Sequence, residues 1–182
     1  KEVERNMIRE AAEFAERAHE GVYRKGTKIP YITHPMETAA IVTAFTNEPE
    51  MIAAALLHDV IEDAGVTKEE LEEKFGSRVA FLVESESEDK SRSWMERKGT
   101  TVEHLKSATR DEKILALADK LSNIRSTVRD YLVLGDEVWQ RFNQKDKEMQ
   151  GWYYKGVAEA LKEFKGHIYY EEYLMLCKKI FG

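Results

Sequence analysis

Histidine and carboxylate side chains stand together in an apolar segment of the chain. The stretch Leu56-Leu57-His58-Asp59-Val60-Ile61-Glu62-Asp63 follows a run of alanines and leucines. A buried ionised group is costly to desolvate unless it has a partner. An imidazole nitrogen beside a carboxylate oxygen suits a divalent metal ion. Taken alone, the segment is better explained by a structural histidine next to a charged helix end.

Two further apolar segments each add a polar side chain of the same kind. The motif Pro30-Tyr31-Ile32-Thr33-His34-Pro35 places an imidazole where a helix is expected to begin. Asp119 lies in the apolar run Leu115-Ala116-Leu117-Ala118, and Asn123 follows one helical turn later. Candidate ligands thus occur in three separate segments, in the order His, His-Asp, Asp. Their conjunction favours a metal site over three unrelated structural residues.

Helices must position these side chains, because apolar residues recur every three or four positions over most of the chain. Thr67 and Glu70 have the spacing of a capping box, and Pro49 suits a first helical turn. The helix that begins at Pro49 is expected to continue through His58 and Asp59 to Ile61, so that Glu62 and Asp63 lie one turn beyond them. The expected helices cover residues 3–18, 35–45, 49–61, 67–76, 79–83, 96–106, 111–131, 136–142, 146–164 and 168–180.

No strand pattern and no internal repeat interrupts this helical pattern. The only low-complexity stretch, residues 84–93, is rich in serine and glutamate and is expected to form a loop. No linker marks a second domain. The sequence predicts an all-α protein of a single domain, with residues 1–135 as its core and the helices of 136–182 packed on the same domain.

Composition excludes several classes of protein. The formal net charge is −6 over 182 residues, which argues against a nucleic-acid partner. No apolar run approaches the roughly 18 residues that cross a bilayer, so no membrane association is expected. A single cysteine rules out an internal disulfide framework and fits a reducing compartment. We therefore expect a cytoplasmic protein.

The ligand-bearing segments together resemble a known family. His34, then His58-Asp59, then Asp119 is similar to the signature of the HD-domain metal-dependent phosphohydrolases. Arg24-Lys25-Gly26 before the Pro30–Pro35 motif, His58–Asp63, and Leu117–Arg125 further resemble the alarmone hydrolases. These are the hydrolase domain of RelA/SpoT-type enzymes and the stand-alone small alarmone hydrolases. The likeness covers residues 9–131 and implies an HD-domain helical bundle.

The resemblance implies roles for individual residues. His34, His58, Asp59 and Asp119 would bind one divalent ion, Mn²⁺ by likeness. Glu62 would transfer protons, and Asp63 would help to position the attacking water. Asn123 would hydrogen-bond the water or the substrate. Substrate contacts are implied for Arg24, Lys25, Lys90 and Ser126.

The implied reaction is hydrolysis of guanosine 3′,5′-bis(diphosphate), ppGpp, to GDP and pyrophosphate. Many family members have a Gly-Val-Thr-like turn where this chain has Ser85-Glu86-Ser87, which leaves the base specificity open. One alternative is an HD-type phosphatase or nucleotidase that acts on another nucleotide or on NADPH. A second is a binding module that has kept the fold without the activity. For the ppGpp hydrolase and for the phosphatase or nucleotidase, the expected partner is a small phosphorylated nucleotide.

Aromatic residues are concentrated in the last third of the chain, between Trp139 and Tyr173. On helices, such residues usually lie in a core or at a subunit interface. A homodimer is therefore one expectation for the assembly. Stacking of these rings on a nucleotide is the less favoured interpretation.

Overall fold

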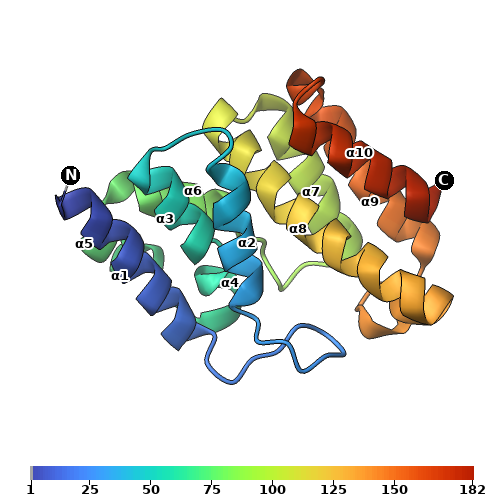
Figure 1. Ribbon diagram of the computed structural model, residues 1–182, viewed down its shortest axis with the longest axis horizontal. Coiled ribbons are helices and arrows are strands. Elements are labelled where there is room, and N and C mark those ends of the chain that lie inside the picture. The colour runs from blue at the N-terminus through green and yellow to red at the C-terminus, as the bar shows by residue number, and fades with distance from the viewer. Residues whose placement is uncertain (1) are drawn as a thin grey trace. The chain divides into compact units, whose positions relative to one another are not determined.

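The computed structural model describes residues 2–182, and helices account for most of them (Figure 1). Within the described range there is no β-strand, only an isolated antiparallel bridge between Tyr23 and Pro30. The expectation of an all-α protein is confirmed. Residue 1, which the expected core of 1–135 includes, lies outside the described range.

The chain divides into two compact units. One runs to Glu88 and also includes Arg110–Asp119, and the other comprises Asp89–Thr109 and Lys120–Gly182. Helix α8 (Arg110–Leu134) contributes residues to both. The predicted organisation as a core of 1–135 with added helices at 136–182 stays a prediction.

The first unit is built around helix α3. This unit contains α1 (Glu2–Ala18), α2 (Thr33–Val42), α3 (Pro49–Leu57), α4 (Val60–Ala64), α5 (Lys68–Phe75) and α6 (Ser77–Ser85). Helix α3 packs against α1, α2 and α6, and Figure 1 shows it beside the first two. Met51 and the run Ala53 to Leu57 are buried. Small and apolar residues cover nearly all of its surface, which suits its central position in this unit.

One expectation about this helix is wrong. The sequence predicted a continuous helix from Pro49 to Ile61, whereas α3 ends at Leu57 and α4 begins at Val60. Asp59 adopts φ −102° and ψ −2°, away from regular helical values, and the His58 ring bonds back to the carbonyl oxygen of Ala55. A side chain that takes up a backbone carbonyl in this way competes with the helical hydrogen-bond pattern. His58 and Glu62 therefore do not lie on one unbroken helix.

Local capping rules account for several boundaries. The Thr67 side chain accepts a hydrogen bond from the Glu70 amide at 3.1 Å, and both halves of the predicted capping box are present. Pro49 occupies the first turn of α3, as predicted. Helix α6 extends to Ser85, so Glu84 and Ser85 are helical and the expected loop at 84–93 is shorter, from residue 86 to 93.

The second unit buries most of the aromatic residues of the C-terminal third. Its elements are α7 (Trp94–Ser107), the later part of α8, η1 (Gly135–Arg141), α9 (Lys147–Ala160), η2 (Lys162–Phe164) and α10 (Ile168–Phe181). Helix α9 packs against both α7 and α10 (Figure 1). Tyr170 and Tyr173 are buried, and their hydroxyls donate to the carbonyl oxygens of Ala158 and Tyr154. These aromatic residues belong to the core of the unit.

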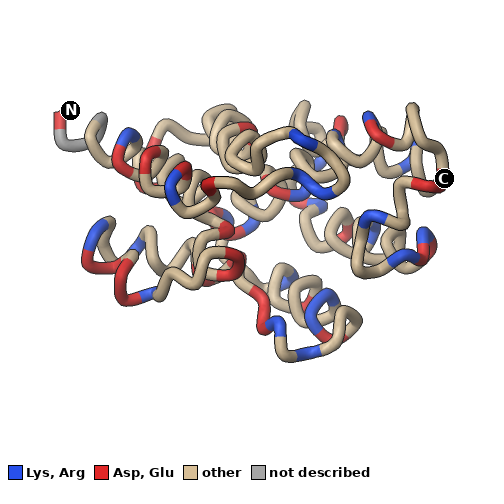
Figure 2. The backbone as a smooth tube through the Cα atoms, turned by 90° about the horizontal axis from the view of Figure 1, so that it is seen from below, with Lys and Arg blue, Asp and Glu red and all other residues tan. Residues whose placement is uncertain are grey.

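Two expected helices of this unit differ in detail. Residues 135–141 form a 3-10 helix where an α-helix at 136–142 was expected. The helix expected at 146–164 is interrupted at Leu161, which leaves α9 and the short η2. Basic and acidic positions are both scattered along the chain (Figure 2). None of the described helices is both long and apolar enough to span a bilayer.

Candidate metal centre

Four predicted ligands come from three places in the first unit. His34 lies in the first turn of α2, and His58 and Asp59 form the turn between α3 and α4. Asp119 lies on α8. His34, His58 and Asp119 are buried. The break after Leu57, which the sequence did not predict, is therefore the feature that presents two adjacent residues to the cluster.

The donor atoms of these side chains converge. His34 Nε2 lies 3.1 Å from His58 Nε2, 3.0 Å from Asp119 Oδ1 and 3.6 Å from Asp59 Oδ2. His58 Nε2 lies 3.0 Å from Asp59 Oδ2 and 3.3 Å from Asp119 Oδ1. Two nitrogens and two oxygens thus face one another in a buried space.

The other nitrogen of His58 has a backbone partner. Nδ1 lies 2.6 Å from the carbonyl oxygen of Ala55. A carbonyl oxygen only accepts, so Nδ1 carries the hydrogen. Such a contact sets the orientation of the ring and directs Nε2 into the cluster, which is the arrangement typical of metal-binding histidines.

Burial and neighbouring charges shift the pKa values in this cluster. Burial lowers the pKa of His34, and its hydrogen bond to Asp119 only partly offsets this effect. Burial alone would raise the pKa of Asp59, but the charge of His58 outweighs it and the pKa falls below its ordinary value. Burial likewise opposes the charge on His58, yet Asp59 and Asp119 hold the pKa of His58 well above its ordinary value. Asp59 is therefore ionised and His34 neutral, the forms in which each binds a metal ion, whereas His58 carries a proton that a metal ion would displace.

The spacing of the donors fits a single small cation. Ligand atoms bonded to one ion at about 2.1 Å lie about 3.0 to 3.4 Å apart in octahedral or tetrahedral geometry. The histidine Nε2 atoms lie 3.0 to 3.6 Å from each other and from the two carboxylate oxygens. The ligand atoms of His34, His58 and Asp59 form a group that could hold a metal ion. Two imidazoles with carboxylates suit a divalent transition metal.

A residue that the sequence analysis did not single out also contacts the cluster. The Tyr31 hydroxyl donates to Asp59 Oδ2 at 2.6 Å. The His19 ring packs against the Tyr31 ring with 4.8 Å between centroids. The sequence signal for Tyr31 was its place in the Pro30–Pro35 motif, three residues before His34. The His19 side chain is also buried.

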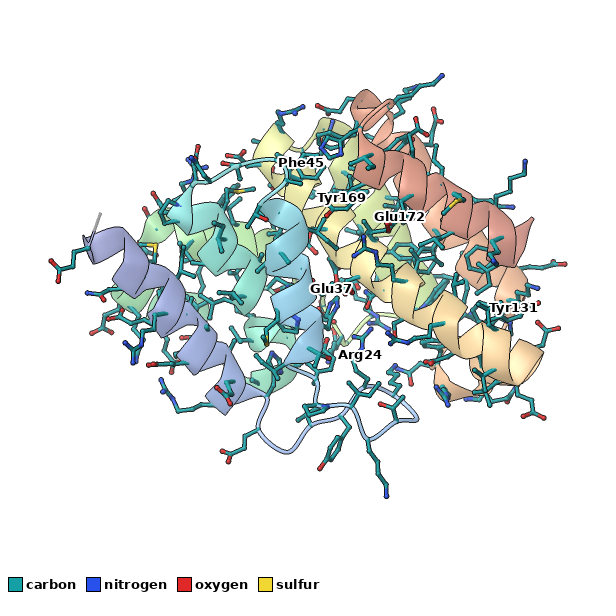
Figure 3. The ribbon with its side chains drawn as sticks, in the orientation of Figure 1. Arg24, Glu37, Phe45, Tyr131, Tyr169 and Glu172 are labelled. Carbon is teal, nitrogen blue, oxygen red and sulfur yellow. The ribbon has the colours of Figure 1, made fainter. Side chains whose placement is uncertain are left out.

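The predicted substrate and proton-transfer residues of this unit flank the cluster. Glu62 and Asp63 lie in the first turn of α4, directly after Asp59. Arg24 and Lys25 belong to the loop before α2, where Figure 3 labels Arg24. The Arg24 guanidinium lies over the Tyr31 ring, 5.6 Å from its centroid. Lys25, the next residue, is exposed.

The remaining predicted site residues belong to the second unit. Asn123 and Ser126 lie on α8, and Lys90 lies between α6 and α7. The Ser126 hydroxyl accepts a hydrogen bond from Arg129 at 3.4 Å. Arg125, at the end of the Leu117–Arg125 motif, pairs with Glu172. The roles of these residues in catalysis stay predictions.

The chain is similar to known proteins over most of its length. A family model described as an HD domain matches residues 11–145. The guanosine-3′,5′-bis(diphosphate) 3′-pyrophosphohydrolase MESH1 of Xenopus tropicalis is 36% identical over 163 residues, which cover 88% of this chain and 86% of that protein. The human protein of the same name is 35% identical over the same coverage. A solved structure described as a metazoan orthologue of SpoT that hydrolyses ppGpp superposes with a TM-score of 0.79 at 26% identity, covering 95% of this chain and 94% of that one.

Proposed function

Since the chain belongs to the HD domain family, we propose that it is a metal-dependent phosphohydrolase that converts ppGpp to GDP and pyrophosphate. Water attacks the phosphorus atom that joins the 3′-diphosphate to the ribose. The bond between this phosphorus and the ribose O3′ breaks, which releases pyrophosphate, and O3′ takes up a proton to become the 3′-hydroxyl of GDP. The observation that carries the proposal is the convergence of donor atoms from His34, His58, Asp59 and Asp119, in which each histidine Nε2 lies 3.0 to 3.6 Å from both carboxylate oxygens.

We assign these four side chains as the ligands of one divalent ion, with Mn²⁺ as the proposed metal. When bound, such an ion acidifies a coordinated water and offsets the negative charge of the phosphate groups. The mixed nitrogen and oxygen donors support a transition metal over Ca²⁺ or Mg²⁺, which prefer oxygen ligands. Burial supports binding too, because it keeps competing water away from His34 and His58.

Glu62 and Asp63 are the proposed acid–base pair. They lie in the turn of helix that directly follows Asp59, where carboxylates can reach a water molecule near the ligands. Glu62 accepts the proton of the attacking water, and Asp63 holds that water in place. The proton is then delivered to the leaving oxygen.

Basic residues of the loop before α2 are the proposed contacts for the substrate. Arg24 presents a planar guanidinium, which either stacks on a base or binds a phosphate through two hydrogen bonds. Lys25 next to it supplies a point charge for the diphosphate. Contacts from Lys90, Asn123 and Ser126 are proposed from the sequence resemblance alone. A cytoplasmic location is proposed from the composition, and a homodimeric assembly from the aromatic residues of the last third of the chain.

The proposal is tested by incubating Mn²⁺-loaded protein with ppGpp, NADPH and a panel of 5′-nucleotides. We expect pyrophosphate and GDP from ppGpp, and no product from the Asp59→Ala variant, which controls for contaminating enzymes. Phosphate release from NADPH or from monophosphates, without turnover of ppGpp, would instead identify a phosphatase or nucleotidase. Absence of turnover with every substrate would favour a binding module.

A further inference from the structure

Tyr31 joins the loop before α2 to the ligand cluster through a short hydrogen bond. Its hydroxyl lies 2.6 Å from Asp59 Oδ2. Burial, and then the charge of Asp59, raise the pKa of Tyr31 far above its ordinary value, so the phenol keeps its proton and acts as the donor. A hydrogen bond to an ionised carboxylate is shorter and stronger than one between neutral groups.

The oxygen that Tyr31 contacts is the one that faces the histidines. Asp59 Oδ2 lies 3.0 Å from His58 Nε2 and 3.6 Å from His34 Nε2. An aspartate side chain can turn about its Cα–Cβ and Cβ–Cγ bonds, and a donor on one oxygen limits that rotation. The phenol therefore determines where this oxygen stands relative to the two imidazoles.

The Tyr31 ring is itself held from several directions. His19 packs at 4.8 Å between ring centroids, and the His34 ring meets it edge-on at 5.8 Å. The backbone amide of Tyr31 donates to the carbonyl oxygen of Val22 at 2.8 Å. His19 Nε2 is buried and has no hydrogen-bond partner among the described residues, so His19 supports the ring by packing.

The Tyr31 ring also packs against Arg24, the proposed substrate-binding arginine. The Arg24 guanidinium lies 5.6 Å from the ring centroid, within the range of a cation–π contact. The amide of Arg24 bonds to the carbonyl oxygen of Ile29 at 2.8 Å, which keeps the loop closed beneath the side chain. Tyr31 therefore contacts both a proposed metal ligand, Asp59, and a proposed substrate-binding residue, Arg24.

We propose that Tyr31 is a positioning residue with two separable parts: its hydroxyl orients Asp59 for the metal ion, and its ring orients Arg24 for the substrate. This inference rests on the proposed function, because it takes Asp59 as a ligand and Arg24 as a substrate contact. Residues that hydrogen-bond a metal ligand typically contribute 10- to 100-fold to metal affinity.

Two variants separate the two parts. Tyr31→Phe removes the hydroxyl and keeps the ring, so we expect Mn²⁺ affinity measured by calorimetry to fall about 10- to 100-fold. The KM for ppGpp at saturating Mn²⁺ should stay unchanged, and added Mn²⁺ should restore kcat. Tyr31→Leu removes the ring as well, and its KM at saturating Mn²⁺ should rise several-fold in addition.

Tyr23→Phe is the matched control, because Tyr23 lies in the same loop with 55% of its surface exposed. It should leave both Mn²⁺ affinity and KM unchanged. Circular dichroism of each metal-free variant, and the visible spectrum of its Co²⁺ complex, separate a change in coordination from a loss of fold. If Tyr31→Leu fails to fold, Tyr31→Phe alone decides the role of the hydroxyl.

The outcomes distinguish this inference from the function on which it rests. Wild-type affinity for Mn²⁺ and an unchanged Co²⁺ spectrum in Tyr31→Phe would overturn the role of Tyr31 and leave the metal site intact. An unchanged KM in a folded Tyr31→Leu variant would overturn the role of the ring. A wild-type protein that binds no metal would overturn both the inference and the proposed function.

Discussion

The carbonyl oxygen of Ala55 holds the Nδ1 atom of His58 at 2.6 Å, and this contact joins the end of helix α3 to the ligand cluster. Ala55 lies in the last turn of α3, where backbone carbonyls lack partners within the helix. The helix end therefore supplies the acceptor, and the first residue beyond the helix supplies the ring. His58 Nε2 is directed toward Asp59 and Asp119 as a result.

Loss of the His58 ring is expected to abolish tight metal binding. His58→Ala removes one of four converging donors and leaves the Ala55 carbonyl without its partner. We expect the affinity for Mn²⁺, measured by calorimetry, to fall by at least about 100-fold. His104→Ala, at an exposed position on α7, is the control and should bind Mn²⁺ as the wild type does. Equal affinity in the two variants would remove His58 from the ligand set.

Metal binding should stabilise the folded chain. An ion that binds only the folded state adds about 2.7 kcal/mol to the free energy of unfolding when its concentration is 100 times Kd. Thermal unfolding with and without Mn²⁺ measures this gain as a rise in Tm that a chelator reverses. Asp59→Ala should show no such rise. An unchanged Tm of the wild type on addition of Mn²⁺ would contradict the assignment of the cluster as a metal site.

The ion pair between Arg125 and Glu172 should contribute to stability. Arg125 donates from two nitrogens, at 2.6 and 2.8 Å, and Tyr169 lies on its guanidinium at 5.4 Å (Figure 3 labels Tyr169 and Glu172). Both charged side chains are less than one-third exposed. Glu172→Gln should lower the free energy of unfolding by about 1 kcal/mol.

The exposed pair of Lys162 and Glu159 is the control for this measurement, because it is bound by a single contact and both side chains face solvent. Glu159→Gln should leave the denaturant midpoint unchanged, since surface pairs contribute little. Equal effects of the two substitutions would show that the two-point geometry of Arg125 adds nothing.

Cys177 should resist alkylation in the folded protein. The side chain is buried, and burial raises the pKa of its thiol to about 11. At pH 8 only about one thiol in a thousand is then ionised, so iodoacetamide should react about 100-fold more slowly than in denaturant. Because the folded pKa exceeds the unfolded value, the thiol's contribution to stability is full below pH 9 and is lost as the pH rises toward 11. Mass spectrometry follows the labelling, and rapid labelling at pH 8 without denaturant would contradict this picture.

Some of this architecture follows from rules that act over a few residues. Pro49 and the Thr67–Glu70 box predicted two helix starts, because capping depends on side chains close in sequence. Ser93 and Glu96 have the same spacing and form the same capping box. The same rule therefore predicts that α7 begins at Trp94, two residues before the expected start at residue 96.

Other features depend on contacts that sequence spacing does not encode. The break after Leu57 requires a particular bond between the His58 ring and the Ala55 carbonyl. Tyr31 and Asp59 are 28 positions apart, and helical periodicity says nothing about such a pair. The order of His34, His58-Asp59 and Asp119 predicted the cluster, whereas its supporting tyrosine became visible only in three dimensions.

The closed loop before α2 separates substrate binding, at its tip, from support of the metal ligands, at its base. Backbone hydrogen bonds from Arg24 to Ile29 and from Tyr31 to Val22 close its base, and the segment between Arg24 and Ile29 forms its tip. Insertions or exchanges at the tip leave that closure, and with it the Tyr31 hydroxyl, in place. Substitutions at the tip can therefore change which nucleotide is bound, while the residues that hold the metal ion stay the same.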